Sequence, residues 1–293
     1  MLKHFLVVFL LVIAMGVQIV EAADSGIVIV QSVSTPVHEK IVSGINSVLK
    51  ENPVIVRVDA VRSIPKPKLF IAIGIDALMA VRDLGVPVVF SMVTNPRGMG
   101  INGKEITGVD IFIGVEQQLD QLRAILPKAK RIGIVYAPSS TGYIVGLARE
   151  AAKKRGIALV SRAVRSADEA IVALDGMTDV DVFWIMPDTT LITQEVVKHL
   201  LLLSLERKIP IYALSEKYVK NGALLALGIN PTLLGRQTGE MANRILSGEK
   251  ASSIPIEPVK EGDLYINTTV AKRFKLEISP DVLDRAFLYR AGE

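Results

Sequence analysis

The feature that most constrains the fold is a pattern that occurs twice. An apolar run, a loop of small hydroxyl residues and a helical pattern follow one another from Ile27 to Lys50, and the same order returns from Ile132 to Lys154. Short apolar runs between turn signals predict buried parallel strands, and strands that alternate with helices predict βα units. We therefore predict an α/β fold of two similar three-layer α/β/α lobes with parallel sheets. A ligand crevice is expected between them, at the carboxyl ends of their strands.

The first residues predict an export signal. Lys3 and His4 form a short basic start, Phe5–Val17 is an apolar run, and Val20–Ala22 fits a cleavage site, which is the layout of a secretory signal peptide. The apolar run is too short to predict a transmembrane helix, and the chain has no cysteine that would carry a lipid anchor. We expect residues 1–22 to be removed and the mature protein to be periplasmic.

Composition narrows the chemistry. The chain has no cysteine, three histidines and a net charge of +4, so disulfides, thiolate nucleophiles and cysteine-bound metals are excluded. Basic and acidic residues are interleaved, without the basic run that nucleic-acid binding requires. His38 and His199 lie inside helical patterns with no catalytic partner in view. We predict a protein that is not an enzyme, with no catalytic residue, metal, cofactor or nucleic-acid partner.

Apolar and amphipathic patterns predict the elements of both lobes. The expected strands are Ile27–Gln31, Val54–Val58, Leu69–Ile73, Val86–Met92, Thr107–Ile113, Arg131–Tyr136, Ile157–Ala163, Val180–Met186, Ile209–Ala213 and Ala223–Leu227. The expected helices are His38–Lys50, Ala77–Leu84, Glu116–Leu126, Tyr143–Lys154, Ala167–Leu174, Thr193–Arg207, Glu216–Asn221 and Pro231–Ser247. In the tail we expect a short strand pair within Ile254–Ile266 and a closing helix at Val270–Phe274. No low-complexity segment separates the lobes, so several crossing segments are expected instead of one linker.

Small polar residues follow the predicted strands in both halves and are the candidate ligand-binding residues. In the first half they are Ser32, Ser34, Thr35, Gly74, Asp76, Thr94 and Asn95. In the second half they are Tyr136, Ser139, Ser140, Thr141, Asp188, Thr189, Ser215 and Glu216. Hydroxyls, free backbone N–H groups and helix N-termini suit a carboxylate, and Asp188 or Glu216 would suit an amine. The alternative is that the serines and threonines only cap helices.

From about Val88 to Gly248 the chain resembles the ABC-transporter substrate-binding family whose characterised members bind aromatic amino acids. The segments that carry the resemblance are VPVVFSMVTNP, ITGVDIFIGVEQQLDQLRAILPKAKRIGIVYAPSS and IPIYALSEKYVKNGALLALGINPTLLGRQTGEMANRILSGE. The helix start Leu-Gly-Arg-Gln-Thr-Gly and the junction Ile-Leu-Pro-x-Ala-Lys-Arg-Ile-Gly are specific in combination. The family has the two-lobed type I periplasmic binding fold.

The resemblance implies that segments are exchanged between the lobes. The first lobe would contain residues 23–112 and about 226–250, and the second lobe residues 113–225 and about 251–293. By this analogy Asn230 reaches the crevice from the hinge. The resemblance also implies a monomer that closes on a small molecule and delivers it to an ABC permease in the membrane.

The chain departs from the family pattern at the site. Gly74-Ile75-Asp76 replaces Gly-Thr or Gly-Ser, Ala213–Glu216 lacks the usual Asp, and Tyr136–Ser139 has Ala in place of Asn. The segment Asp59–Lys68 stands where the family has a full helix.

We therefore expect the exported receptor of an ABC importer, which closes on a small carboxylate-bearing ligand such as an amino acid. The alternative is a ligand-sensing or ligand-free receptor that acts through a protein partner instead of a permease. A hydrolase in the same crevice is disfavoured by the absent cysteines and the unpaired histidines.

Overall fold

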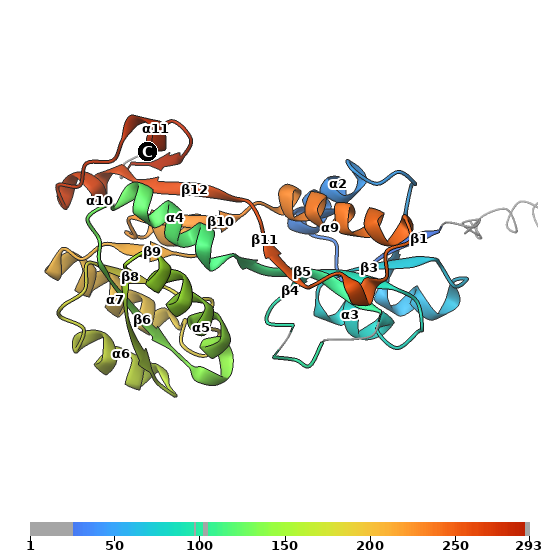
Figure 1. Ribbon diagram of the computed structural model, residues 1–293, viewed down its shortest axis with the longest axis horizontal. Helices are drawn as coiled ribbons and strands as arrows, with labels where there is room; N and C mark the ends of the chain where they lie inside the picture. Colours follow the sequence, from blue (N-terminus) through green and yellow to red (C-terminus); the bar gives the residue numbers. More distant parts are fainter. Residues whose placement is uncertain (1–25, 97, 102–104, 291–293) are drawn as a thin grey trace, which may run out of the picture.

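The chain forms two lobes, each built around one sheet (Figure 1). The computed structural model describes residues 26–290 apart from residue 97 and residues 102–104. The predicted signal peptide, residues 1–22, lies outside the described residues. Within those residues no helix has both the length and the apolar character needed to cross a membrane.

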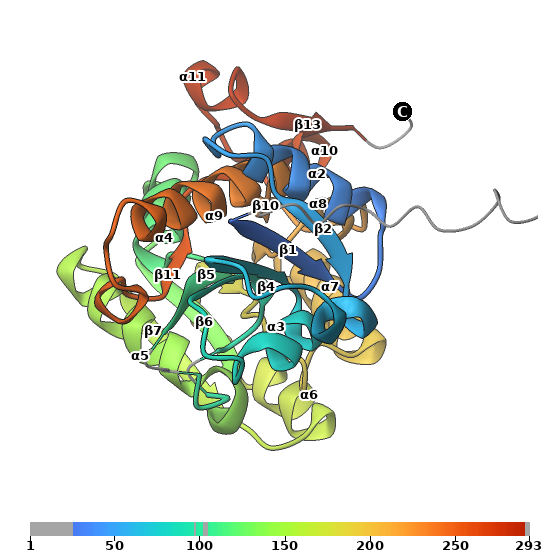
Figure 2. The same ribbon diagram turned by 90° about the vertical axis from the view of Figure 1, so that its right-hand side faces the viewer.

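The first lobe contains a six-stranded parallel sheet with the order β11-β5-β4-β3-β1-β2. Its strands are β1 (Ile27–Gln31), β2 (Val54–Arg57), β3 (Leu69–Ile73), β4 (Val88–Val93), β5 (Ile106–Ile113) and β11 (Glu257–Val259). Its helices are α2 (Pro36–Asn46), η1 (Val58–Ser63), α3 (Ile75–Val81), α9 (Pro231–Leu246) and η2 (Ala251–Ser253). Figure 2 shows α2 and α9 on one face of this sheet and α3 on the other. Alternate residues of β1 accordingly face two different cores, Ile27 and Ile29 in one and Val28 and Val30 in the other.

Helices α2 and α9 lie side by side, although almost two hundred residues separate them (Figure 1). Gly44 allows this close contact, because a Cβ atom at this position would overlap the backbone carbonyl of Thr232. Asn243 strengthens the contact by donating from Nδ2 to the carbonyl oxygen of Val48 at 2.8 Å. A segment from late in the chain is thereby built into the first lobe.

The second lobe contains a seven-stranded sheet with the order β13-β12-β10-β9-β8-β6-β7. Its strands are β6 (Arg131–Tyr136), β7 (Ala158–Ala163), β8 (Val182–Trp184), β9 (Ile211–Ala213), β10 (Leu225–Ile229), β12 (Gly262–Asn267) and β13 (Phe287–Tyr289). Its helices are α4 (Val115–Ile125), α5 (Pro138–Lys154), α6 (Ala167–Asp175), α7 (Gln194–Arg207), α8 (Glu216–Lys220), α10 (Thr268–Arg273) and α11 (Pro280–Leu283). Buried residues of α4 and α5 pack on one face, and those of α6 and α7 on the other. Only the pairing of β10 with β12 is antiparallel among the strands described.

Three segments cross between the lobes. The chain leaves the first sheet after β5 and enters α4 at Gly114, returns at Asn230 between β10 and α9, and leaves again at Lys260–Glu261 between β11 and β12. The second and third crossings lie four and about nine residues later in the chain than the expected boundaries near residues 226 and 251. β10 stays in the second sheet because it pairs with β9 and β12, and β11 stays in the first because it pairs with β5.

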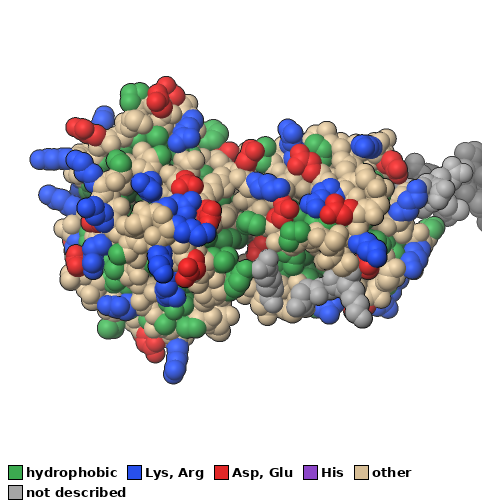
Figure 3. Space-filling model, in the orientation of Figure 1, with side chains coloured by type: hydrophobic (Ala, Val, Ile, Leu, Met, Phe, Trp, Pro, Cys, Tyr) green, Lys and Arg blue, Asp and Glu red, His purple; other side chains and the backbone are tan. Residues whose placement is uncertain are grey.

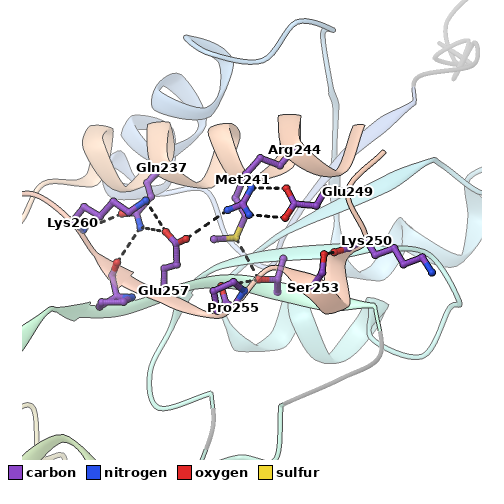
Figure 4. Close-up of polar contacts among 11 residues, drawn as sticks. Gln237, Met241, Arg244, Glu249, Lys250, Ser253, Pro255, Glu257 and Lys260 are labelled. Atoms are coloured by element: carbon purple, nitrogen blue, oxygen red, sulfur yellow. Dashed lines mark hydrogen bonds and ion pairs between the residues drawn. The ribbon is translucent and has the colours of Figure 1, made fainter. Parts of the chain in front are cut away.

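The third crossing segment is fastened to α9 by Gln237 (Figure 4). Its Nε2 donates to the carbonyl oxygen of Pro258 at 3.0 Å, and its Oε1 accepts from the backbone N–H of Lys260 at 3.1 Å. Glu257 lies beside this amide and forms ion pairs with Lys260 and Arg244 at 2.7 and 3.6 Å. These contacts hold the segment to the first lobe up to Lys260, so its change of lobe is confined to Glu261.

The structure confirms the predicted fold class and most of the predicted elements. β1, β3 and β6 have the predicted bounds. The predicted closing helix at Val270–Phe274 corresponds to α10, but the predicted strand pair in the tail was wrong, because β11 and β12 do not pair with each other and instead join different sheets. The predicted shortening of the first lobe corresponds to η1, a single short 3-10 helix.

Candidate functional site

The carboxyl ends of both sheets face the gap between the lobes. β5 leaves the first sheet toward the second lobe at its carboxyl end, and β10 leaves the second sheet toward the first lobe in the same way. The other parallel strands of each sheet point the same way as these two. The residues that follow β1, β3 and β4 therefore lie opposite those that follow β6, β8 and β9, which is where open α/β sheets bind ligands.

In the first lobe the predicted ligand-binding residues follow three strands, β4, β3 and β1, which are neighbours in the sheet in that order. Ser34, Asp76 and Thr94 are exposed, and Ser32, Thr35, Gly74 and Asn95 are half-buried. Thr35 caps α2, since its hydroxyl accepts from the backbone N–H of His38 at 3.4 Å and also contacts the His38 ring at 2.8 Å. For this residue the helix-cap interpretation therefore holds.

The second lobe brings its predicted groups to the ends of β6, β8, β9 and β10, which are neighbours in the sheet. Ser139, Thr189 and Glu216 are exposed, and Tyr136, Ser140, Ser215 and Asn230 are half-buried. Glu216 already pairs with Lys220 at 2.7 Å, one turn along α8. Ser139–Thr141 were expected in a loop before a helix and instead form the first turn of α5, which begins at Pro138.

Asp188 is buried and already has protein partners. Only 1% of its surface is exposed. Its Oδ2 accepts from the backbone N–H of Ala137 at 2.8 Å and from the hydroxyl of Thr141 at 2.6 Å, while Oδ1 accepts from the backbone N–H of Thr190 at 3.0 Å. A carboxylate so placed joins the loop after β8 to the first turn of α5. Its role in this conformation is to position that turn, and its burial leaves almost none of the carboxylate accessible to a ligand amine.

Asn230 is also engaged by the protein. Its Oδ1 accepts from the backbone N–H groups of Thr232 and Leu233 at 3.0 and 3.1 Å and so caps α9, while its Nδ2 donates to the carboxylate of Asp263 at 3.1 and 3.2 Å. These bonds join the second crossing segment to the third. The amide is thus part of the hinge.

One predicted pair is in direct contact across the gap. Asn95, after β4 in the first lobe, donates from Nδ2 to the backbone carbonyl oxygen of Ser140 in the second lobe at 3.2 Å. The strand-end groups of the two lobes therefore meet at this point.

A groove of about 380 Å³ has walls from both lobes. Its apolar lining comes from β5, α4, α5 and the segment around β11: Phe112, Val115, Tyr143, Ile144, Leu147, Ala151, Ile256 and Pro258. Asp110, Glu116, Glu150 and Lys154 supply charged groups. Figure 3 shows that the molecule narrows between the lobes and that hydrophobic side chains gather beside the gap.

None of the sixteen predicted ligand residues lines this groove. Of those residues, Ser34 borders a separate surface groove along α2, and Asp188 borders a small cavity of about 50 Å³ inside the second lobe. The sequence did carry a signal for the interlobe groove. Tyr143 and Leu147 lie four residues apart on α5 and are 51% and 41% exposed, so they form an apolar stripe that α5 leaves outside the core.

The aromatic residues of the second lobe divide between core and surface. Trp184 stacks on Tyr212 with a centroid distance of 5.9 Å, and its Nε1 donates to Oε1 of Gln118 at 3.0 Å. Both rings are buried, and burial raises the pKa of the Tyr212 hydroxyl. Trp184 is therefore a core residue. In the part of the chain that the structure describes, no three His, Asp or Glu side chains gather as metal ligands would.

Comparisons with known proteins agree with this architecture. The model of the ABC transporter substrate binding protein family matches residues 64–289. A tyrosine-binding protein of Clostridioides difficile is 25% identical over 201 residues, which cover 66% of this chain and 58% of that protein. The chain thus spans less than two thirds of the length of this relative.

Two solved structures share the fold. One is the ligand-free, open structure of a substrate-binding protein with adhesive properties from Clostridium difficile, with a TM-score of 0.68, 24% identity and coverage of 90% of this chain and 98% of that one. The other is an ABC domain in complex with L-Trp from Streptococcus pneumonia, with a TM-score of 0.59, 24% identity and coverage of 89% and 98%.

Two parallel-sheet lobes, joined by three crossing segments around a gap, define the type I periplasmic binding fold. The chain belongs to the ABC transporter substrate-binding protein family. This is a family of solute-binding proteins and not of enzymes, so the chain is a substrate-binding protein.

Proposed function

We propose that this protein is the exported receptor of an ABC importer and that it closes its lobes on an aromatic amino acid. The observation that carries the proposal is the apolar groove along α5, whose Tyr143 lies one helical turn after the strand-end residue Ser139. It gives one ligand two different environments, an apolar wall for a ring and polar groups for a charged head. The names of the relatives, a tyrosine-binding protein and a complex with L-Trp, point to the same ligand class.

The ligand carboxylate is proposed to bind at the first turn of α5. This helix has 17 residues, and its Ser139 N–H precedes the first intrahelical hydrogen bonds, which the Ser140 and Thr141 N–H groups donate to the carbonyl oxygen of Ala137. Ser139 and Ser140 add hydroxyls there, and Thr94 precedes Asn95, which contacts Ser140 from the first lobe. The positive end of the helix dipole and these donors together favour a small anion.

The ligand amine is proposed to bind Asp76 or Glu216. Asp188, the other candidate, is 1% exposed and accepts three hydrogen bonds from the protein, which leaves these two exposed carboxylates among the predicted residues. Asp76 stands in the first turn of α3, and Glu216 pairs with Lys220 across exposed surface, where an ion pair contributes little and is readily exchanged.

The aromatic ring is proposed to lie in the groove against Phe112, Tyr143 and Leu147. The last two are half exposed in this conformation, so closure around a ring would remove apolar surface from water. The groove has walls from both lobes, which couples its occupation to the angle between them. Delivery to a membrane permease and a location outside the cytoplasm follow from the same proposal.

The test is calorimetric titration with L-tyrosine and L-tryptophan, preceded by a thermal-shift screen that also contains aliphatic amino acids, keto acids and sugars. A ligand present at one hundred times its Kd stabilises the folded protein by about 2.7 kcal/mol, which raises Tm by several degrees at this chain length. We expect the aromatic amino acids to give the largest shifts. A folded protein that binds a sugar or keto acid, and no amino acid, would contradict the ligand class.

Ligand analogues assign the two charged subsites. Tyramine lacks the carboxylate, and 3-(4-hydroxyphenyl)propionate lacks the amine. If Asp76 holds the amine, Asp76→Asn weakens L-tyrosine binding about tenfold or more and leaves binding of the propionate unchanged. Glu216→Gln is the matched variant for the second candidate. Equal losses for both ligands in both variants would exclude either carboxylate as the amine partner.

A further inference from the structure

We propose that Asn95 and Ser140 form an interlobe latch, which joins the rims of the two lobes before any ligand is bound. The latch is the hydrogen bond from Asn95 Nδ2 to the backbone carbonyl oxygen of Ser140, at 3.2 Å. It lies outside the three crossing segments and joins the end of β4 to the first turn of α5. The lobes are thus connected at a fourth place, through a contact that opening must break.

The first lobe holds the Asn95 amide in a fixed orientation. Asn95 has a left-handed backbone conformation, with φ of 50°, which Asn tolerates better than most residues. Its Oδ1 accepts from the backbone N–H of Gly98 at 3.1 Å, so the opposite end of the amide, Nδ2, is directed to the second lobe. Both polar atoms of the side-chain amide, Oδ1 and Nδ2, are therefore hydrogen-bonded.

Gly98 makes room for this amide. A Cβ atom at Gly98 would overlap the side-chain amide of Asn95. An alanine at this position is therefore expected to displace the Asn95 side chain. The substitution perturbs the latch without removing either of its partners.

The second lobe holds the carbonyl of Ser140 through Asp188. This buried carboxylate binds the backbone N–H of Ala137 and the hydroxyl of Thr141, which flank Ser140 in the first turn of α5. Thr141 is itself only 1% exposed. Asp188 is therefore a positioning residue for the latch, and it reaches Asn95 only through α5.

A single half-buried hydrogen bond of this kind shifts an equilibrium by roughly two- to tenfold. Loss of the latch is expected to move the ligand-free protein by this factor toward more widely separated lobes. The effect belongs to the ligand-free protein, so its test does not depend on which solute the protein binds.

The test is a distance distribution between the lobes in the ligand-free protein. The chain contains no cysteine, so Asp83→Cys on the first lobe and Val172→Cys on the second can be spin-labelled without competing sites. Both positions are well exposed, with 84% of the Asp83 side chain and 73% of Val172 accessible. Pulsed electron spin resonance then reports the populations of short and long interlobe distances.

Asn95→Ala and Gly98→Ala are each expected to raise the ratio of long to short distances by two- to tenfold. Asn46→Ala, an exposed Asn on the same lobe, is the control and should leave the distribution unchanged. Asp188→Asn should shift the distribution in the same direction, and if this variant does not fold, the variants Asn95→Ala and Gly98→Ala decide. Distributions for Asn95→Ala and Gly98→Ala that match the parent protein would overturn the latch.

Discussion

Replacing Gln237 by Leu tests whether the hinge is fastened by a side-chain amide. Gln237 is 7% exposed, and its amide pairs with two backbone groups of the third crossing segment, the Pro258 carbonyl and the Lys260 N–H. Leu has a similar volume and leaves both groups without this partner. Each buried group that loses its partner costs about 1–3 kcal/mol, and added apolar burial offsets part of this, so we expect a loss of about 2–4 kcal/mol.

Two measurements separate this effect from general loosening. Urea unfolding followed by circular dichroism reports both lobes, while fluorescence of Trp184, the single tryptophan, reports the second lobe alone. Hydrogen exchange shows whether the Lys260 N–H loses its protection. We expect Gln237→Leu to lower stability by circular dichroism and to accelerate exchange at Lys260.

The matched control is Gln121→Leu, which removes a half-exposed amide that accepts from Arg285 at 3.3 Å. Its stability should stay within about 0.5 kcal/mol of the parent. If Gln237→Leu behaves like this control and Lys260 stays protected, the amide does not fasten the segment.

Three further predictions concern other parts of the fold. Tyr212→Phe should leave stability unchanged or raise it by about 1 kcal/mol in thermal unfolding, because the buried hydroxyl has no hydrogen-bond partner among the described residues; a loss above 1 kcal/mol would mean that the hydroxyl is satisfied. Gly44→Ala should cost about 1–3 kcal/mol or more in urea unfolding, since its Cβ would overlap the Thr232 carbonyl; a neutral result would show that α2 and α9 separate easily. Arg155 donates to both oxygens of Asp120 at 2.7 and 2.9 Å and lowers the pKa of that carboxyl, so the pair contributes stability above about pH 4 that is lost as the pH falls further. Arg155→Gln should therefore be less stable than the parent at neutral pH, and this gap should narrow in acid; a gap independent of pH would contradict the ion pair.

The sequence predicted the strands well where they are apolar and buried on both faces. β1 and β3 are entirely or almost entirely buried, and their bounds agree with the apolar runs. β11 was assigned to the wrong partner because it has only three residues, one of them Pro258, and no periodic pattern. Its sheet is decided by pairing with β5, a contact between residues far apart in the chain.

Helix starts were harder to predict where proline comes first. The predicted helix at Tyr143 begins five residues earlier, at Pro138, because proline suits the first helical position and needs no hydrogen-bond acceptor. The loop of small hydroxyls after β6 is therefore the first turn of α5. This places Ser139 and Ser140 at a helix N-terminus, where their proposed role is strongest.

The candidate site was predicted from the polar residues that follow the strands. This prediction located residues around the gap, since the carboxyl ends of parallel strands share one edge of a sheet. It could not tell which polar groups the protein uses for itself, because the capping role of Thr35 and the burial of Asp188 depend on three-dimensional contacts. The complete apolar groove could not be predicted for the same reason, since its walls come from both lobes, although Tyr143 and Leu147 carried a signal for its α5 wall.

Small-angle X-ray scattering of the mature protein, with and without saturating L-tyrosine or L-tryptophan, tests the central claim most directly. If the lobes close on an aromatic amino acid, the radius of gyration falls when ligand is added. Whichever of Asp76→Asn and Glu216→Gln weakens binding should need more ligand to reach the same decrease. Binding by calorimetry with an unchanged scattering profile would place the ligand outside the interlobe gap and contradict the account.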